Sequence, residues 1–323
     1  MKLTPADLDQ KVNGLLCERG FTAEDASTIS KPILWAVLHG NNQGLLKFVG
    51  EPALKKDMTQ RPISILKETA CTAWFDGGER IAMIVVQTLV DKAKELLKKS
   101  GIVAVGNRGT RSSCGALAYF TEQLAHEGFI AVMLCRTPPT VAPFGAIEPL
   151  FGTNPISISF PSIGAPITFD MATAAIAWYG LIEAAAAGEE VDSTAVIDAL
   201  GKPTSNPDVV LKDGMVLPFD RGHKGSGLGM AVELIGGPLL GGAFCQSEGE
   251  WGNMLLALDP DMFAGKGEFR KHCSALIERL KGAKTDNSAV RLPGERATAF
   301  YEEVKSSGSV EIPEFVTKKL GWN

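Results

Sequence analysis

The sequence lacks the residues that build most metal sites and disulfide frameworks. It has only four histidines among 323 residues, which leaves little material for a histidine-based metal cage. None of its six cysteines forms a CxxC pair, and their wide spacing indicates reduced, mostly buried thiols. We therefore predict a protein with no metal ion and no disulfide framework.

Long apolar runs and basic clusters are also missing. The first residues, MKLTPADLDQKVNGLL, contain no continuous apolar stretch, so no signal peptide is expected. Glu183 interrupts the most apolar window, residues 171–188, which argues against a membrane span. Lysine and arginine are dispersed and the net charge is −5, so we expect no binding to nucleic acid or to membranes. These absences predict a cytoplasmic protein.

The chain does contain an alternation of helical and strand patterns. The predicted helices cover residues 3–31 (two helices), 81–99, 116–127, 225–235, 268–281 and 295–307. The predicted strands cover residues 73–75, 101–105, 129–135, 155–160 and 167–169, with a turn at 76–78. This alternation predicts the α/β (or α+β) class, with a boundary near residue 72 where a mainly helical part meets a mixed part.

Glycine is abundant, with 35 residues, which indicates many places where the backbone turns sharply or approaches a partner closely. One run, RGHKGSGLG at residues 221–229, opens an apolar helix but fits neither the GxGxxG nor the GxxxxGK[ST] motif. Two interpretations stay open for it. Either the helix N-terminus binds a phosphate with the help of Lys224, or the small residues allow close helix packing.

Three other places have both a chemical and a structural interpretation. His39 stands where a helix ends, so it either caps carbonyl groups or donates a proton to a substrate. Asp170 follows a strand, and it either caps the next helix or contacts a ligand. The segment RSSCG at residues 111–115 is interpreted as a structural turn rather than as the site of a serine or cysteine nucleophile.

Taken in order, these segments resemble the type 2 malate/L-lactate dehydrogenase family. That family includes sulfolactate, ureidoglycolate and diketogulonate oxidoreductases and the piperideine/pyrroline-2-carboxylate reductases. The resemblance extends over nearly the whole chain. The matching segments are His39-Gly40, Pro143–Ala146, Leu150–Pro155, Asp170–Thr173, Gly201–Thr204, Leu217-Pro218, Gly222–Gly225 and Leu292–Arg296.

The resemblance implies an oxidoreductase that uses NAD or NADP without a GxGxxG fingerprint. It implies a mainly helical domain of residues 1–72, completed by C-terminal helices within 290–323. Residues 73–289 would form a non-Rossmann mixed α/β nicotinamide-binding domain. A homodimer and a small-molecule substrate are implied as well.

The resemblance also assigns roles to residues of this chain. His39 is the implied proton donor, and Asp170 is expected in the catalytic site and at the cofactor. The full set of implied cofactor contacts is Thr137, Asp170, Met171, Ala172, His223, Lys224, Gly225, Gly294 and Glu295.

Three departures from the family pattern bear on the substrate. Leu38 replaces the serine before the active histidine, and the arginine that grips the substrate carboxylate is missing, with Gln43 and Lys47 nearest to its place. Ser113 stands where the family has a second histidine, and we include it in the expected catalytic set. We expect Gln43, Lys47 and Arg111 to bind the substrate. Losing the planar fork of an arginine predicts a substrate that differs from the family's 2-hydroxy acids.

Together these points predict a reductase of a C=N group, as in a cyclic ketimine, or of a C=O group next to a carboxylate. Hydride would come from the nicotinamide, and His39 would protonate the product. One alternative is a catalytically degenerate paralogue that binds a nucleotide and has a structural or regulatory role. Another is a hydrolase with a nucleophile at Ser112, Ser113 or Cys114.

Overall fold

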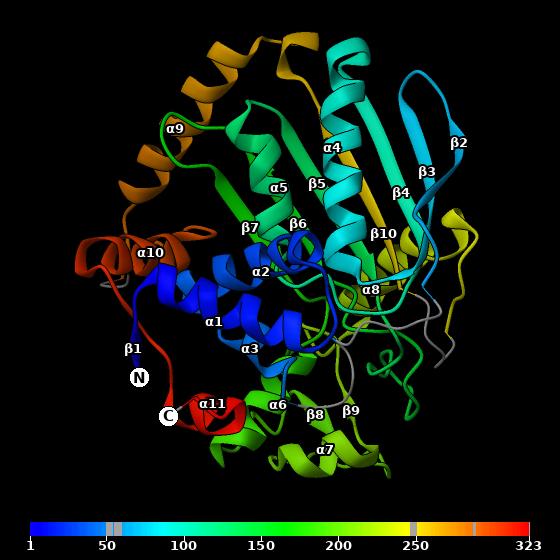
Figure 1. Ribbon diagram of the computed structural model, residues 1–323, viewed down its shortest axis with the longest axis vertical. Helices are drawn as coiled ribbons and strands as arrows, with labels where there is room; N and C mark the ends of the chain where they lie inside the picture. Colours follow the sequence, from blue (N-terminus) through cyan, green and yellow to red (C-terminus); the bar gives the residue numbers. More distant parts are fainter. Residues whose placement is uncertain (50–53, 55–59, 246–250, 287–288, 323) are drawn as a thin grey trace.

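A mixed seven-stranded sheet forms the centre of the computed structural model, which describes residues 1–49, 54, 60–245, 251–286 and 289–322 (Figure 1). The strand order is β2-β3-β4-β10-β5-β6-β7; β3 and β4 pair in parallel, and the other neighbours pair antiparallel. This arrangement confirms the predicted class and differs from a doubly wound parallel sheet. In sequence order the strands are β2 (Ser64–Glu68), β3 (Thr72–Arg80), β4 (Ile102–Thr110), β5 (Ile130–Arg136), β6 (Ile156–Phe160), β7 (Ile167–Met171) and β10 (Trp251–Leu258).

Helices cover both faces of this sheet. On one face, α4 (Ala82–Ser100) and α5 (Leu117–His126) bury an apolar cluster against β3, β4, β5 and β10. On the other face, α8 (His223–Gly236) and the short 3₁₀ helix Pro238–Leu240 pack on β4, β5 and β10. Figure 1 shows α4 and α5 in front of the sheet and α8 behind it. The predicted helices at 81–99, 116–127 and 225–235 are therefore confirmed.

The N-terminal helices begin at the capping residues that the sequence indicates. They are α1 (Pro5–Glu18), α2 (Ala23–Leu38) and the short α3 (Gln43–Leu46). The Thr4 hydroxyl accepts a hydrogen bond from the backbone N–H of Asp7 at 3.1 Å, and Pro5 occupies the first helical turn. Thr22 likewise accepts from the N–H of the third residue after it. These caps confirm the two predicted helices within residues 3–31.

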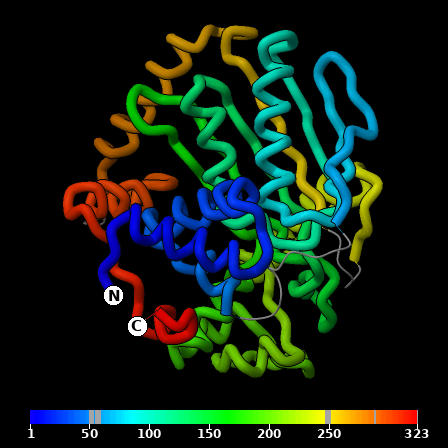
Figure 2. Tube along the Cα trace, viewed as in Figure 1, coloured from blue at the N-terminus to red at the C-terminus, as the bar shows by residue number. Residues whose placement is uncertain are grey.

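The C-terminal segment packs on these first helices. The strand β1 (Lys2–Leu3) pairs antiparallel with β11 (Val310–Glu311), and the N-terminal ammonium donates to the carbonyl of Ile312 at 2.9 Å. Apolar residues of α10 (Glu295–Ser307) and α11 (Glu314–Leu320) join the buried cluster of α1 and α2. Figure 2 shows the two ends of the chain close together.

Most of the remaining elements pack around a smaller apolar cluster beside the sheet. One helix, α9, lies at the periphery. The peripheral helix α9 lies at the outer edge of the sheet in Figure 1. These elements are α6 (Trp178–Ala187), β8 (Val196–Ile197), α7 (Pro207–Asp213), β9 (Met215–Val216), the 3₁₀ helix Pro260–Met262 and α9 (Lys266–Lys281).

The predicted turn at residues 76–78 is wrong. The strand β3 continues through this segment to Arg80, with a register shift against β4 between Asp76 and Arg80. Gly78 has a φ of +64°, and a Cβ there would lie 2.2 Å from the carbonyl oxygen of Arg61. The glycines therefore permit a bulge inside a strand rather than ending it. The sheet also begins before residue 72, with β2 at Ser64.

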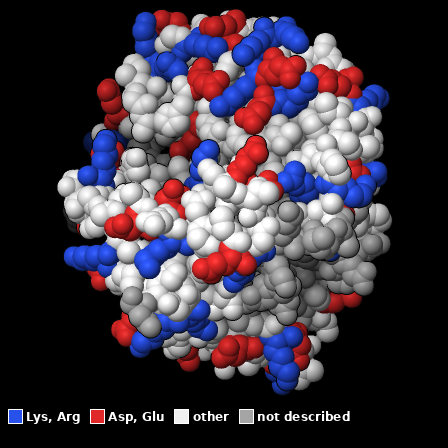
Figure 3. All heavy atoms as spheres, in the orientation of Figure 1, with Lys and Arg blue, Asp and Glu red and all other residues white. Residues whose placement is uncertain are grey.

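Charged side chains of both signs alternate over the face of the molecule in Figure 3. In the part of the chain that the structure describes, no helix combines the length and apolarity needed to cross a membrane.

Candidate active site

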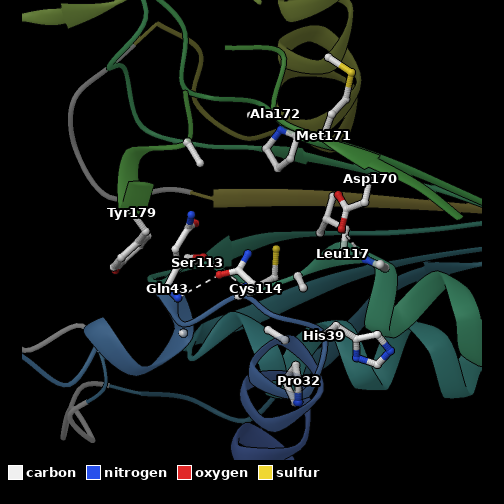
Figure 4. Close-up of a pocket in the computed structure, with 18 of the residues that line it drawn as sticks. Pro32, His39, Gln43, Ser113, Cys114, Leu117, Asp170, Met171, Ala172 and Tyr179 are labelled. Carbon is white, nitrogen blue, oxygen red and sulfur yellow. Dashed lines mark hydrogen bonds between the residues drawn. The ribbon is translucent and has the colours of Figure 1, made fainter. Parts of the chain in front are cut away.

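A pocket of about 680 Å³ lies between the N-terminal helices and one side of the sheet. Its walls come from α2, α3, the loop before α5, the ends of β5 and β7, and the starts of α6 and α10. The volume falls within the range of about 300–1,000 Å³ that small-molecule sites occupy. Figure 4 shows His39 and Asp170 toward one side of this pocket and Gln43 and Tyr179 toward the other.

Most of the residues expected in a site meet in this pocket, although they come from distant parts of the sequence. Five of the expected residues do not line it: Arg111, His223, Lys224, Gly225 and Glu295. The expected residues that do line it are His39, Gln43, Lys47, Ser113, Thr137, Asp170, Met171, Ala172 and Gly294.

His39 is held by both its ring and its backbone. It is the C-terminal cap of α2, and its Nδ1 lies 2.6 Å from the carbonyl oxygen of Trp35. Because a carbonyl oxygen only accepts, the hydrogen sits on Nδ1 and leaves Nε2 for a partner in the pocket. The ring stacks on Trp35 at 3.9 Å and on Tyr301 at 4.7 Å between centroids. Burial lowers the pKa of His39, against the opposing effect of the Trp35 bond.

Asp170 lies at the N-terminus of α5, a helix that precedes it in the sequence. Its Oδ2 accepts the backbone N–H of Ala118 at 2.8 Å, so it caps α5 across the pocket rather than the helix that follows it. The carboxyl group of Asp170 faces the pocket, so part of its surface is accessible to solvent. Protein atoms surround the rest of the group. This desolvation raises the pKa of Asp170 to about 6, although hydrogen bonds from Ala118 and Leu117 act in the opposite direction.

Glu122 is a pocket residue that the sequence analysis did not identify. It stands on α5, and its carboxylate accepts hydrogen bonds from the side chains of Thr168 and Trp35. Desolvation raises the pKa of Glu122, and the charge of Asp170 adds to this effect. The pocket therefore has an acidic side, formed by Glu122 and Asp170, which we call the carboxyl side.

Lys47 provides positive charge at the opposite side of the pocket. Only 5% of Lys47 is exposed, and its Nζ lies 3.9 Å from the ring centroid of Tyr179. Burial lowers the pKa of Lys47 to about 8. Gln43 also lines this side, where it hydrogen-bonds to the side chain of Glu183.

The RSSCG segment is held by a hydrogen bond within itself and by one to the start of α4. The Ser113 hydroxyl accepts the N–H of Gly115 at 3.2 Å, and the Ser112 hydroxyl accepts the N–H of Ala82 at 3.0 Å. These bonds support the structural interpretation of the segment. Arg111 extends away from the pocket and pairs with Glu79 at 2.7 Å.

Thr137 belongs to a buried polar network behind the pocket wall. Its N–H donates to Oδ1 of Asn154 at 3.0 Å, and the Asn154 amide donates to Oε2 of Glu233 at 2.8 Å. Glu233, on α8, also pairs with Arg136 at 3.1 Å, and both side chains are at most 3% exposed. Because a buried, hydrogen-bonded ion pair holds the residues around it in place, the Arg136–Glu233 pair and Asn154 link α8 to Thr137 in the pocket wall.

The glycine-rich start of α8 is already filled by a carboxylate from the same chain. Oδ1 of Asp220 accepts the N–H groups of Gly222 and Gly225 at 2.9 and 3.0 Å. A Cβ on Gly225 would lie 2.3 Å from that oxygen, which supports the close-packing interpretation of this run. His223 and Lys224 are exposed at its surface.

The remaining expected cofactor residues lie at the start of α10. Gly294 has a φ of +75°, and a Cβ there would lie 3.0 Å from the carbonyl oxygen of Thr168. Glu295 pairs with Lys281 of α9 and accepts the N–H of Leu292. The close approach of Gly294 to β7 closes one wall of the pocket.

Comparison with known proteins gives one consistent result. The family model described as "Malate/L-lactate dehydrogenase" matches residues 3–321. Ureidoglycolate dehydrogenase (NAD(+)) of Escherichia coli K12 is 29% identical over 295 residues, covering 87% of this chain and 83% of the relative. The delta(1)-pyrroline-2-carboxylate/delta(1)-piperideine-2-carboxylate reductase of Pseudomonas syringae pv. tomato is 37% identical over 230 residues, covering 68% of this chain and 63% of the relative.

The fold is also similar to that of solved structures. The crystal structure of malate dehydrogenase from Entamoeba histolytica superposes with a TM-score of 0.90 at 22% identity. The superposition covers 99% of this chain and 96% of the other.

Proposed function

The chain belongs to the malate/L-lactate dehydrogenase family and is an NAD(P)-dependent oxidoreductase, and from this premise we propose that it reduces a C=N or C=O group next to a carboxylate. One observation carries the proposal: a single pocket holds a histidine whose Nε2 is available and a buried lysine. Those are the groups needed to move a proton and to hold a carboxylate.

Lys47 is the proposed anchor for the substrate carboxylate, with Gln43 beside it. An ammonium buried over a ring is costly to desolvate, and among the described residues Lys47 forms no ion pair. An arriving carboxylate would supply the missing partner and restore the charged state of the lysine. This arrangement replaces the fork of an arginine with a point charge, so the substrate is held less rigidly in orientation.

The carboxyl side favours a C=N substrate over a C=O substrate. Ionised Asp170 and Glu122 would attract a protonated imine nitrogen, whereas a neutral carbonyl oxygen gains nothing from them. A cyclic imino acid carries both charges, a carboxylate for Lys47 and an iminium for Asp170. We therefore propose a cyclic ketimine next to a carboxylate as the preferred substrate class.

The residues of the pocket fit a nicotinamide. The buried Thr140 Oγ1 lines the pocket and has no hydrogen-bond partner among the described residues, so a ligand can satisfy it. When bound, NADH or NADPH supplies hydride to the substrate carbon. The proposed contacts inside the pocket are Thr137, Asp170, Met171, Ala172 and Gly294, with His223, Lys224, Gly225 and Glu295 outside it.

His39 is the proposed proton donor for a carbonyl substrate. Protonated His39 would release its proton from Nε2 to the product oxygen, and its lowered pKa makes it a stronger acid than free histidine. An iminium nitrogen already carries its proton, so His39 would then orient the substrate instead. The dependence of activity on His39 thus distinguishes the two substrate types.

The test is an oxidation screen with NADH and NADPH over cyclic imino acids and 2-oxo acids. We expect turnover with a cyclic imino acid at a higher kcat/KM than with any 2-oxo acid. Cofactor binding without turnover on either class would contradict the proposal and favour the degenerate paralogue, which predicts thermal stabilisation by NAD(P)H alone. Light scattering of the same sample tests the further proposal of a homodimer.

A further inference from the structure

Two cysteines that the proposed reaction does not use lie in contact in the pocket wall. Cys114, in the loop before α5, and Cys135, near the end of β5, have their sulfur atoms 3.6 Å apart. Both line the pocket, and they are 2% and 0% exposed. A small reagent in the pocket therefore meets Cys114 first, and Cys135 lies directly behind it, shielded from solvent.

The geometry permits a bond between these two sulfurs. A disulfide has a sulfur–sulfur distance of about 2.05 Å, so the atoms must approach by about 1.5 Å. Cys135 is fixed, because it pairs with Asn253 of β10 inside the sheet. Cys114 lies in a loop and precedes Gly115, whose φ is +82°. A Cβ added to Gly115 would lie 3.4 Å from Met83, so the backbone here passes close to α4. Most of the movement therefore falls on Cys114.

The positions of the two sulfurs favour Cys114 as the attacking sulfur, because Cys114 lies in a loop and keeps 2% of its surface exposed, whereas Cys135 lies in β5 and is 0% exposed. The buried ammonium of Lys47 interacts with both thiols and stabilises a thiolate. The hydrogen bond with Cys114 and burial raise the pKa of Cys135, so Cys135 remains a thiol. Cys114 is therefore assigned the first step of the reaction and Cys135 the second.

We propose that Cys114 and Cys135 are a dithiol modification site that hydrogen peroxide converts to a disulfide. The Cys114 thiolate attacks one oxygen of the peroxide, the O–O bond breaks, and the released hydroxide takes the proton lost by Cys114. This step gives water and a sulfenic acid. The Cys135 sulfur then attacks the Cys114 sulfur, the S–O bond breaks, and the second hydroxide leaves as water with the Cys135 proton. The two thiols lose two electrons, and the peroxide is reduced to two waters.

Formation of the disulfide would change the shape of the pocket wall, whether or not a substrate is bound. It draws Cys114 away from its present position, and Ser113 and Gly115, its pocket-lining neighbours, must follow. It also removes the thiols that interact with Lys47. We expect reversible loss of activity on oxidation, and slower oxidation when NAD(P)H occupies the pocket.

The experiment treats the reduced, full-length chain with hydrogen peroxide and maps its peptides by mass spectrometry. We expect a cross-linked peptide that joins Cys114 to Cys135, with the mass of two hydrogens lost, and its disappearance with dithiothreitol. Persistence of both thiols while the exposed Cys17 and Cys245 oxidise would overturn the proposal. So would a disulfide that joins either of them to a different cysteine.

Variants separate this chemistry from simple packing. Cys135→Ser leaves no resolving sulfur, so it should trap a dimedone-reactive sulfenic acid on Cys114. Cys245→Ser, the matched exposed control, should oxidise like the unaltered chain. Lys47→Gln should slow oxidation, because it removes the ammonium that stabilises negative charge beside the two sulfurs. An unchanged rate in Lys47→Gln, with a normal thermal unfolding curve, would contradict the role of the lysine. The peptide map of the unaltered chain stands independently of whether any variant folds.

Discussion

The pocket and the N-terminus of α8 are both places where this chain can meet a negative group, but they differ in what already fills them. At α8, the backbone N–H groups of Gly222 and Gly225 bind the carboxylate of Asp220. In the pocket, Lys47 lies over Tyr179 and His39 keeps Nε2 available. A helix N-terminus attracts anions, but here Asp220 already occupies two backbone N–H groups, so a cofactor would meet mainly the exposed side chains of His223 and Lys224. We therefore expect the substrate to bind in the pocket, where Lys47 is buried and His39 keeps a ring nitrogen available.

The largest effect is expected at His39. With a 2-oxo acid substrate, His39→Ala should lower kcat roughly 10²- to 10⁴-fold, the usual contribution of a positioned acid. With a cyclic imino acid the loss should be much smaller. His126→Ala, on the exposed side of α5, is the matched control and should leave steady-state rates unchanged. Equal losses in the two histidine variants would show that His39 has no special role.

The connection between the two regions should be costly to break. Glu233→Gln should reduce the free energy of unfolding by about 3–5 kcal/mol, because it leaves the buried Arg136 without this carboxylate. Urea unfolding measures the change. Glu268→Gln removes the partner of the exposed Lys271 and should change little. Similar results for the two variants would mean that α8 and the pocket are not held by this network.

Lys47 and Lys224 offer a direct test of the comparison. Lys47→Met should raise the KM of a carboxylate substrate roughly 10- to 100-fold, because a charge-assisted hydrogen bond is worth about 1.5–3 kcal/mol. Lys224→Met, at the filled helix end, should leave the substrate KM nearly unchanged. The measurement is the substrate KM of each variant from steady-state kinetics at saturating cofactor. The comparison fails if Lys224→Met has the larger effect on substrate.

The pH dependence of KM should reflect the same lysine. The pKa of Lys47 is lowered to about 8, so the ammonium is present below pH 8 and is lost as the pH rises through that value. The substrate KM should therefore be steady below pH 8 and should rise above it. Lys47→Arg keeps its charge over this range and should abolish the rise. A rise that survives in Lys47→Arg must come from another group.

The smallest effect is expected at Asp220. Asp220→Ala should cost about 0.5–2 kcal/mol in the free energy of unfolding, the usual value of a lost helix cap. Asp220→Asn keeps an accepting oxygen and should retain most of that stability. Thermal or urea unfolding measures both variants. A large loss of cofactor affinity in Asp220→Asn, without loss of stability, would show that Asp220 takes part in cofactor binding and does not only cap α8.

The sequence predicted the elements better than the positions of side chains. Periodicity located α5 and β5 because each is regular and has its own apolar face. It failed at residues 76–78, since a glycine pair looks the same in a turn and in a strand bulge. The sequence predicts that Asp170 is a cap or a ligand contact, but the helix it caps lies far from it in the chain. Such a pairing follows from the sheet order, which local patterns do not contain.

Glu122 is a pocket residue whose position could not be predicted from the sequence. On α5 it neighbours polar residues such as Gln123 and His126, which suggests a solvated face. Only the approach of α2 and β7 turns it toward the pocket, where Trp35 and Thr168 bind it. His39 and Asp170 could be identified from the family motifs because each motif is a short continuous segment of the sequence. The burial of Lys47 and the contact between Cys114 and Cys135 depend on packing that no local motif records.

The stacking of His39 on Tyr301 also bears on how the protein is made. During synthesis on the ribosome, α2 emerges before the central sheet, but α10 and the residues after it that complete the buried cluster emerge after β10. A domain cannot close its core before all of its parts are available. A nascent chain should therefore carry an exposed, unfinished site until α10 has emerged, and a chain truncated before Tyr301 should lack a finished site even though it contains every strand of the central sheet.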